Sequence, residues 1–151
     1  MDVLITPEAG REIEALKAFR PKPGTWGAII GHKRGPRFIV EKVMLAGGPG
    51  TVPDERLAAG LDEVWPGRTV GLLVVRPGAD FRKAVLGPAW YGKLVLRWAG
   101  PRKAPVLQPS VVEFERRFFL DPVPFAPAAK EKVISPVTLS MLNVFVNFTF
   151  L

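Results

Sequence analysis

The side chains that most often carry enzyme chemistry are scarce in this sequence. Among 151 residues there is no cysteine and one histidine, His32. A chain without cysteine has no thiol nucleophile and cannot hold zinc or an iron–sulfur cluster through thiolates. His32 stands in the polar run 32–36 between two apolar runs, with neither a nucleophile nor an orienting carboxylate signalled beside it. We therefore interpret it as a solvated turn residue and not as a general base.

The sequence motifs of two other enzyme classes are also missing. No Gly-x-Ser-x-Gly motif surrounds Ser110, Ser135 or Ser140, so serine hydrolysis is unsupported. The glycine-rich run 47–50 lacks the lysine and the following helix start of a phosphate-binding loop. Asp80 follows a Pro-Gly turn, and we interpret it as the cap of a short helix, the alternative being a polar group in a cleft.

Positive charge is concentrated in two stretches, 21–50 and 76–103, and the chain has a formal net charge of +7. Such a chain can meet nucleic acid, anionic lipid or an acidic protein, or can simply be soluble through self-repulsion. Trp90, Tyr91 and Trp98 stand among the cations, as in stacking platforms for single-stranded nucleic acid. The candidate basic interaction patch consists of Lys33, Arg34, Arg37, Arg82, Lys83, Arg102 and Lys103.

The elements that must position these residues follow from the apolar pattern, which predicts an α+β domain with a mixed β-sheet flanked by helices. We expect a strand at 2–5, a helix at 7–19 capped by Thr6, a hairpin over 25–45, a helix at 53–65 and a buried central strand at 69–75. A short helix at 79–86 and alternating strands at 92–98 and 110–120 follow, with Arg116 breaking the second alternation.

Composition divides the chain into a domain at 2–121, a Pro/Ala-rich linker at 122–132 and an uncharged tail at 133–151. Alternation in the tail favours a strand over a membrane-spanning helix. An uncharged strand would pair with its own sheet or, through 139–151, with a second copy or a protein partner. No secretory signal is visible at the start of the chain, so we expect a cytoplasmic protein without a membrane span.

The order of these elements resembles that of the JAB/MPN (Mov34) domain family. Two runs carry the resemblance, Gly27–Gly31 on the second strand and Val70–Pro77 on the central one. Family members typically open with a helix, continue with a Gly-x-Leu-x-Gly-like strand and its hairpin partner, and later end a strand in Val-Gly-x-x-His-x-His-Pro. The resemblance covers 2–121 and implies a JAB/MPN-like fold with the cytidine-deaminase-like α/β/α architecture.

Catalytic members of that family are zinc peptidases with two histidines and an aspartate on zinc, a glutamate that activates water and a serine at the oxyanion. The corresponding positions here are Val74 and Arg76 for the histidines, Gly87 for the aspartate, Gly24 for the glutamate and Ala84 for the serine. Arg76 puts a fixed positive charge where a dication would sit. The resemblance therefore implies a degenerate, non-catalytic scaffold or protein-interaction module with no metal and no other cofactor. The alternatives are a basic nucleic-acid-binding domain and a hydrolase with a displaced site.

Overall fold

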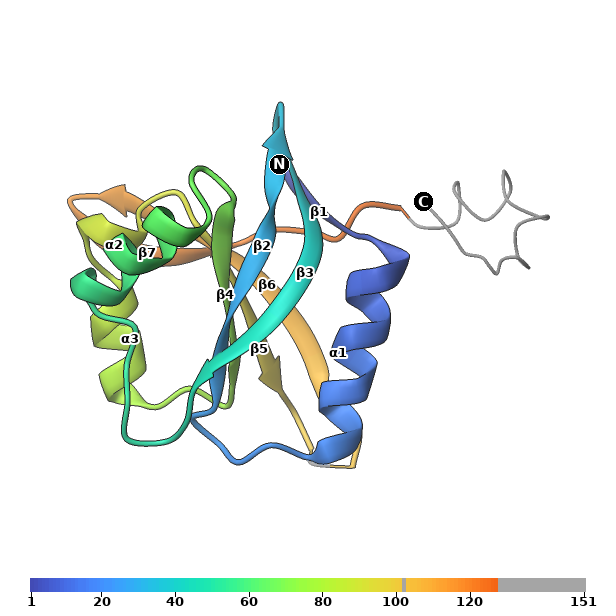
Figure 1. Ribbon diagram of the computed structural model, residues 1–151. Helices are drawn as coiled ribbons and strands as arrows, with labels where there is room; N and C mark the ends of the chain where they lie inside the picture. The colour runs from blue at the N-terminus through green and yellow to red at the C-terminus, as the bar shows by residue number, and fades with distance from the viewer. Residues whose placement is uncertain (102, 128–151) are drawn as a thin grey trace.

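The computed structural model describes residues 1–101 and 103–127. Within them, one seven-stranded mixed sheet is combined with three α-helices and one short 3-10 helix (Figure 1). The strands are β1 (Asp2–Ile5), β2 (Trp26–Arg34), β3 (Arg37–Gly47), β4 (Thr69–Val75), β5 (Leu94–Ala99), β6 (Val106–Glu115) and β7 (Arg117–Pro122). The helices are α1 (Pro7–Phe19), α2 (Glu55–Val64), α3 (Ala79–Val85) and the 3-10 helix η1 (Pro88–Trp90). The predicted α+β class with a mixed sheet is confirmed.

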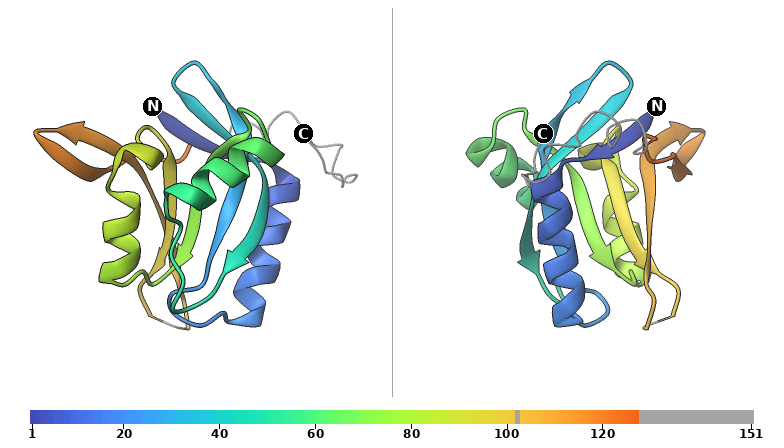
Figure 2. Two further views of the ribbon diagram at one scale, coloured as in Figure 1. Left: turned by 60° about the vertical axis from the view of Figure 1, so that its left-hand side comes forward. Right: turned by 90° about the vertical axis from the view of Figure 1, so that its right-hand side faces the viewer.

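The strands follow one another across the sheet in the order β1-β3-β2-β4-β5-β6-β7. Two neighbouring pairs are parallel, β1 with β3 and β4 with β5, and the other pairs are antiparallel. Helices cover both faces of the sheet, with α1 on one side and α2, α3 and η1 on the other (Figure 2). The described chain is therefore layered as helix, sheet, helix.

β4 lies at the centre of this arrangement and is buried along its whole length. Its side chains alternate between two apolar clusters, with Leu73 in the cluster beneath α1 and Leu72 in the cluster beneath α2 and α3. A strand covered on both faces needs apolar residues at every position, which is the uninterrupted run that predicted it. None of the helices in the described part of the chain is long and apolar enough to cross a membrane.

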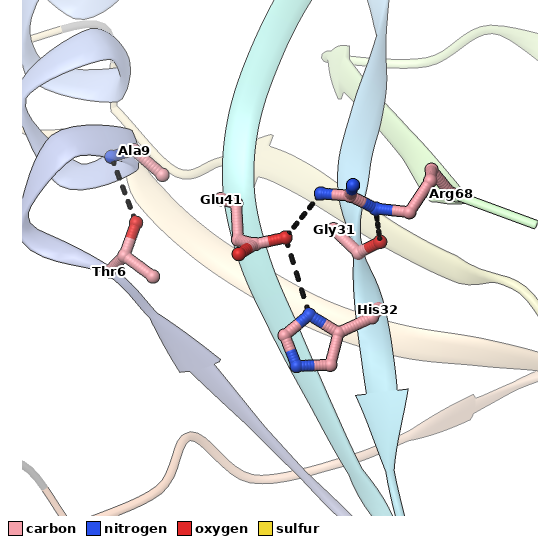
Figure 3. A network of polar contacts seen from close by, with 6 residues as sticks. All are labelled: Thr6, Ala9, Gly31, His32, Glu41 and Arg68. Atoms are coloured by element: carbon pink, nitrogen blue, oxygen red, sulfur yellow. Dashed lines mark hydrogen bonds and ion pairs between the residues drawn. The ribbon is translucent and has the colours of Figure 1, made fainter. Parts of the chain in front are cut away.

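The first helix forms where its end signals place it. The Thr6 hydroxyl accepts a hydrogen bond of 3.2 Å from the Ala9 amide (Figure 3), and Pro7 occupies the first turn, where no amide proton is needed. The helix ends at Phe19 because Arg20 adopts a left-handed backbone with a φ of 49°. The prediction of a helix at 7–19 with a Thr6 cap is confirmed.

Two glycines of the runs that carry the family resemblance stand where strands approach closely. A Cβ atom at Gly31 would overlap the carbonyl oxygen of Ile39, and one at Gly71 would overlap the carbonyl oxygen of Leu94. The register between β2 and β3 shifts beside Gly31, leaving Glu41 as the extra residue of a β-bulge. These glycines are therefore fixed by strand geometry.

One predicted strand, 110–120, is wrong. It is an antiparallel pair, β6 and β7, that reverses at Arg116, whose φ of 70° is left-handed. Because a tight hairpin keeps the period-two alternation on both sides of its turn, Phe114 and Phe118 face each other and the sequence pattern looks continuous. The misfit at Arg116 was the visible sign of the turn.

The chain that follows β7 runs along the opposite edge of the sheet. The Val3 amide donates to the Pro124 carbonyl at 3.0 Å, and the Ala126 amide donates to the Val3 carbonyl at 2.8 Å. The first residues of the predicted linker thus cover the outer edge of β1. The rest of that linker and the predicted tail strand at 133–151 lie outside the described residues.

Candidate functional site

The end of β4 and the start of β2 meet at one end of the sheet. The Gly24 amide donates to the Val75 carbonyl at 2.6 Å, and the Val75 amide donates to the Thr25 carbonyl at 2.8 Å. β4 and β5 are parallel neighbours, and the carboxyl ends of parallel strands are where α/β sheets commonly bind ligands. Residues at this end of the sheet are therefore the first candidates for a functional site.

Two of the five positions that the resemblance matches to catalytic groups share a pocket here. Gly24 and Arg76 line a pocket of about 380 Å³, with Pro49, Asp80 and Phe81 among its other walls. Neither Ala84, half-buried on α3, nor Gly87, which follows α3, lines it. The structure thus brings Gly24 and Arg76 together and leaves Ala84 and Gly87 outside.

Val74 adjoins this pocket but does not line it. Its side chain is fully buried in the apolar cluster that contains Trp26 and Phe81. Val74 on β4 pairs with Trp26 on β2, and Trp26 is two residues after Gly24 in the chain. The position matched to the first histidine is therefore a packed core residue in this chain.

Arg76 is held in an unusual backbone conformation. Its φ is 45°, a left-handed value that a residue with a Cβ atom adopts at a cost, and its amide donates to the Trp98 carbonyl at 3.1 Å. The guanidinium is always charged and supplies no lone pair, so it repels a dication and cannot ligate one. Within residues 1–101 and 103–127, no three His, Cys, Asp or Glu side chains are grouped so that they could hold a metal ion.

Asp80 is not the cap of α3. The helix begins at Ala79 because Gly78 takes the extended cap conformation, and no side chain hydrogen-bonds there. Asp80 lies in the first helical turn and is exposed at the wall of the pocket, where its charge faces the positive end of the helix. The position of Asp80 fits the alternative interpretation, a polar group in a cleft.

His32 has an orienting carboxylate that sequence reasoning missed. It lies on β2 and not in the turn, and its Nδ1 is 3.2 Å from Oε1 of Glu41 (Figure 3). The same oxygen accepts a bond of 2.6 Å from Arg68 Nη2, while Arg68 Nε donates to the Gly31 carbonyl at 2.8 Å. The bulge at Glu41 creates this contact, and a bulge has no reliable sequence signal. Glu41 on β3 therefore contacts both His32 on β2 and Arg68, which directly precedes β4, so this network links three strands of the sheet.

The predicted basic patch is not one surface. Lys33, Arg34 and Arg37 lie at the β2–β3 turn, whereas Lys103 lies in the loop between β5 and β6. β2 starts beside Val74 and is nine residues long, so its far end is about 30 Å from the carboxyl end of β4. Arg82 and Lys83 are exposed on α3, and Arg102 lies outside the described residues.

Arg37 is already engaged by an acidic partner. Its Nε and Nη2 donate to the two carboxylate oxygens of Asp2 at 2.8 and 2.9 Å, which ties β1 to β3. The hydrogen bond from Arg37 holds the pKa of Asp2 below its ordinary value, since it favours the charged carboxylate. Arg37 therefore serves the fold and is not available as a member of an interaction patch.

Comparisons with known proteins support the fold but identify no family for this chain. No family model matches the chain, and no curated protein matches it. Among solved structures, the chain is similar to the solution structure of protein DSY2949 from Desulfitobacterium hafniense, with 17% sequence identity and a TM-score of 0.55. The match covers 82% of this chain and 92% of that one. At this identity the similarity supports the fold alone.

Proposed function

We propose that this chain is a JAB/MPN-like domain that works without zinc and without catalysis, as a protein-interaction module. One observation carries the proposal: Gly24 and Arg76, matched by the resemblance to the water-activating glutamate and a histidine ligand, line the same pocket at the end of β4. A glycine cannot activate water, and a guanidinium cannot ligate a metal ion. If the resemblance holds, this pocket corresponds to the peptidase centre of the family, and the two groups present at the matched positions cannot perform its chemistry.

The order and packing of the elements support the JAB/MPN-like part of this proposal. A strand, a helix, a hairpin, a helix and a central strand follow in the order of the resemblance, and helices cover both faces of the sheet. Gly31 and Gly71, which belong to the matched runs, are required by close strand approach. The fold alone does not assign a function, so the proposal depends on the site.

The open edge of the sheet supports the interaction part. The outer edge of β1 is covered by 124–126, whereas β7 has no second strand neighbour among the described residues. Beside β7 lie exposed aromatic rings, with Tyr91 at 54% and Phe114 at 53% exposure. Both views of Figure 2 show the β6–β7 turn projecting from the rest of the sheet. A free apolar edge of this kind favours strand addition.

We infer that the occupant of this edge is a second copy of the chain, through its uncharged residues 139–151. The described chain ends at Pro127, after lying along β1, which is the edge of the sheet opposite β7. A neighbouring copy can present its tail to β7 without crossing its own sheet. Nucleic acid is not favoured as a partner, since the cations at the β2–β3 turn and at Lys103 lie at opposite ends of the sheet.

The self-association can be tested on the full chain with one charge at the open edge. Phe119→Lys on β7 is expected to convert an oligomer into a monomer in sedimentation velocity, because a lysine blocks strand addition at an edge. Ending the chain at Pro127 is expected to have the same effect. The matched control is Phe19→Lys, which changes an 82% exposed phenylalanine on α1 and is expected to leave the oligomer intact. A monomeric full chain at every concentration would contradict the inference.

The absence of zinc chemistry is tested separately. The full chain prepared with excess zinc and then dialysed is expected to retain far less than one zinc ion per chain by mass spectrometry. Arg76→Gln is expected to behave in the same way, because it removes the positive charge without adding a cysteine, histidine or carboxylate, the side chains that bind zinc in proteins. Stoichiometric zinc in the unaltered chain would refute the proposal of a metal-free module.

A further inference from the structure

A second pocket lies on the other side of Arg76, facing α1. It measures about 430 Å³ and is bordered by the end of α1, the end of β4 and the loop between β5 and β6. Four of its lining residues are basic, and we refer to it as the four-cation pocket: Lys17, Arg20, Arg76 and Lys103. Its other walls are Pro21, Val75, Trp98 and Pro105, and no acidic residue lines it.

The four cations lack ion-pair partners in the part of the chain that the structure describes. Within residues 1–101 and 103–127, no carboxylate lies within ion-pair distance of any of them. By contrast, Lys42 on β3 pairs with Glu12, and Arg68 pairs with Glu41. Four basic residues and no acidic residue around one concave site give it a positive potential, which an anion would offset. The charge distribution therefore points to an anionic ligand.

Backbone geometry at Arg76 gives an independent reason. Arg20 has a φ of 49° and Arg76 a φ of 45°, left-handed values that glycine adopts freely and other residues adopt at a cost. Each is fixed by a hydrogen bond, from the Arg20 amide to the Lys17 carbonyl and from the Arg76 amide to the Trp98 carbonyl, both 3.1 Å. At Arg20 this conformation ends α1, as left-handed residues commonly do after a helix. Arg76 follows a strand and not a helix, and residues held in sparsely populated backbone conformations cluster at ligand sites.

A purely structural role explains only part of this arrangement. Lys17 and Arg20 stand at the carboxyl end of α1, where positive charge is favourable to the helix dipole. Arg76 and Lys103 come from β4 and from the β5–β6 loop, far from any helix carboxyl end in sequence. Four cations from three elements converge on one pocket, and helix capping does not require that convergence.

We propose that the four-cation pocket binds a small ligand that carries a diphosphate group. A diphosphate concentrates several negative charges in a small volume, which matches four cations better than a single carboxylate or phosphate does. Arginine binds phosphate oxygens through a two-pronged set of donors, and lysine adds point charges. The volume of about 430 Å³ falls within the range of small-ligand pockets. This inference does not depend on the proposed interaction function.

The pocket favours a small ligand over a nucleic acid or an acidic peptide. A polymer would need cations that continue along its path. Of the other predicted basic residues, Lys33 and Arg34 lie at the opposite end of β2, and Arg82 and Lys83 lie on α3, which covers the other face of the sheet from α1. The diphosphate can be free or part of a nucleotide, because the two share the group that the cations recognise. Comparing pyrophosphate with ADP distinguishes these sources.

The test is calorimetric titration of the full chain with pyrophosphate, ADP and orthophosphate at low salt. Pyrophosphate or ADP is expected to bind at least tenfold more tightly than orthophosphate, with an affinity that falls as salt is added. Arg20→Gly and Arg76→Gly are each expected to weaken binding about tenfold or more, since each removes charge-assisted hydrogen bonds. Because both positions have glycine-like backbones, neither variant is expected to lose thermal stability.

The matched control is Arg116→Gly at the β6–β7 turn. It removes the same charge from the same backbone conformation, at a φ of 70°, but from the opposite end of β6. Diphosphate affinity is expected to be unchanged in this variant. The inference is overturned if no diphosphate binds, if orthophosphate binds equally well, if Arg116→Gly weakens binding as much as Arg76→Gly, or if single-stranded DNA or an acidic peptide binds more tightly.

Discussion

Replacing Gly71 with alanine is expected to lower the free energy of unfolding by about 3 kcal/mol, the upper end of the usual cost of overpacking. Gly71 lies on the central strand, between Ile29 of β2 and Leu94 of β5. A Cβ atom there would overlap the carbonyl oxygen of Leu94, which is backbone and cannot rotate away. β4 and β5 would have to move apart, which would weaken the hydrogen bonds of this parallel pair. Urea denaturation followed by circular dichroism measures the change.

The control for this prediction is Gly60→Ala. Gly60 lies in α2, where a Cβ atom would meet no atom within 4 Å. Alanine in a helix interior is more favourable than glycine by about 0.5–1 kcal/mol, so this variant is expected to be slightly more stable than the unaltered chain. Equal stability of Gly71→Ala and Gly60→Ala would mean that β4 and β5 are not packed as described.

Trp90→Ala is expected to destabilise the protein by about 3–5 kcal/mol, as is usual when a large buried aromatic side chain is removed. Trp90 is 1% exposed and belongs to the apolar cluster under α2 and α3. Its indole nitrogen donates to the Pro53 carbonyl at 2.8 Å, which anchors the chain just before α2. α2 has no fully buried residue of its own, so it depends on this neighbour for its position.

A second substitution separates packing from hydrogen bonding at this site. Trp90→Phe keeps an aromatic ring but leaves the Pro53 carbonyl without its donor, which costs about 1–3 kcal/mol for a buried group. Trp65→Ala is the matched control. Trp65 is only half-buried at the end of α2, so this substitution is expected to lower the free energy of unfolding by less than Trp90→Ala does. The same denaturation experiment ranks the three variants. A Trp90→Ala chain as stable as Trp65→Ala would contradict the packing assigned to η1.

Arg76 links the two pockets at the carboxyl end of β4. On the α3 side its charge opposes a metal ion, at a position that the family resemblance matches to a ligand. On the α1 side the same residue joins three other cations around the four-cation pocket. Arg76 therefore lines both pockets and can add its charge to each. The zinc and diphosphate experiments address the two pockets separately. Arg76→Gln is expected to retain no more zinc than the unaltered chain, whereas Arg76→Gly is expected to weaken diphosphate binding.

The sequence by itself determined which elements form along most of the chain. The strands at 2–5 and 69–75 and the helix at 7–19 have the bounds that local patterns predict, because caps, prolines and apolar runs act within a few residues. The absence of cysteine excludes thiol chemistry, and the single His32 excludes a site that needs two imidazole groups from one chain, whatever the fold.

Only the tertiary structure decided which distant residues meet. Glu41 reaches His32 because a bulge turns it there, and the reversal at Arg116 divides one apparent strand into β6 and β7. The four-cation pocket joins residues from α1, β4 and the β5–β6 loop, which no spacing in the sequence relates. Local periodicity reports the backbone state of neighbouring residues. Strand order, bulges and left-handed residues, which set these encounters, depend on contacts between segments far apart in the chain.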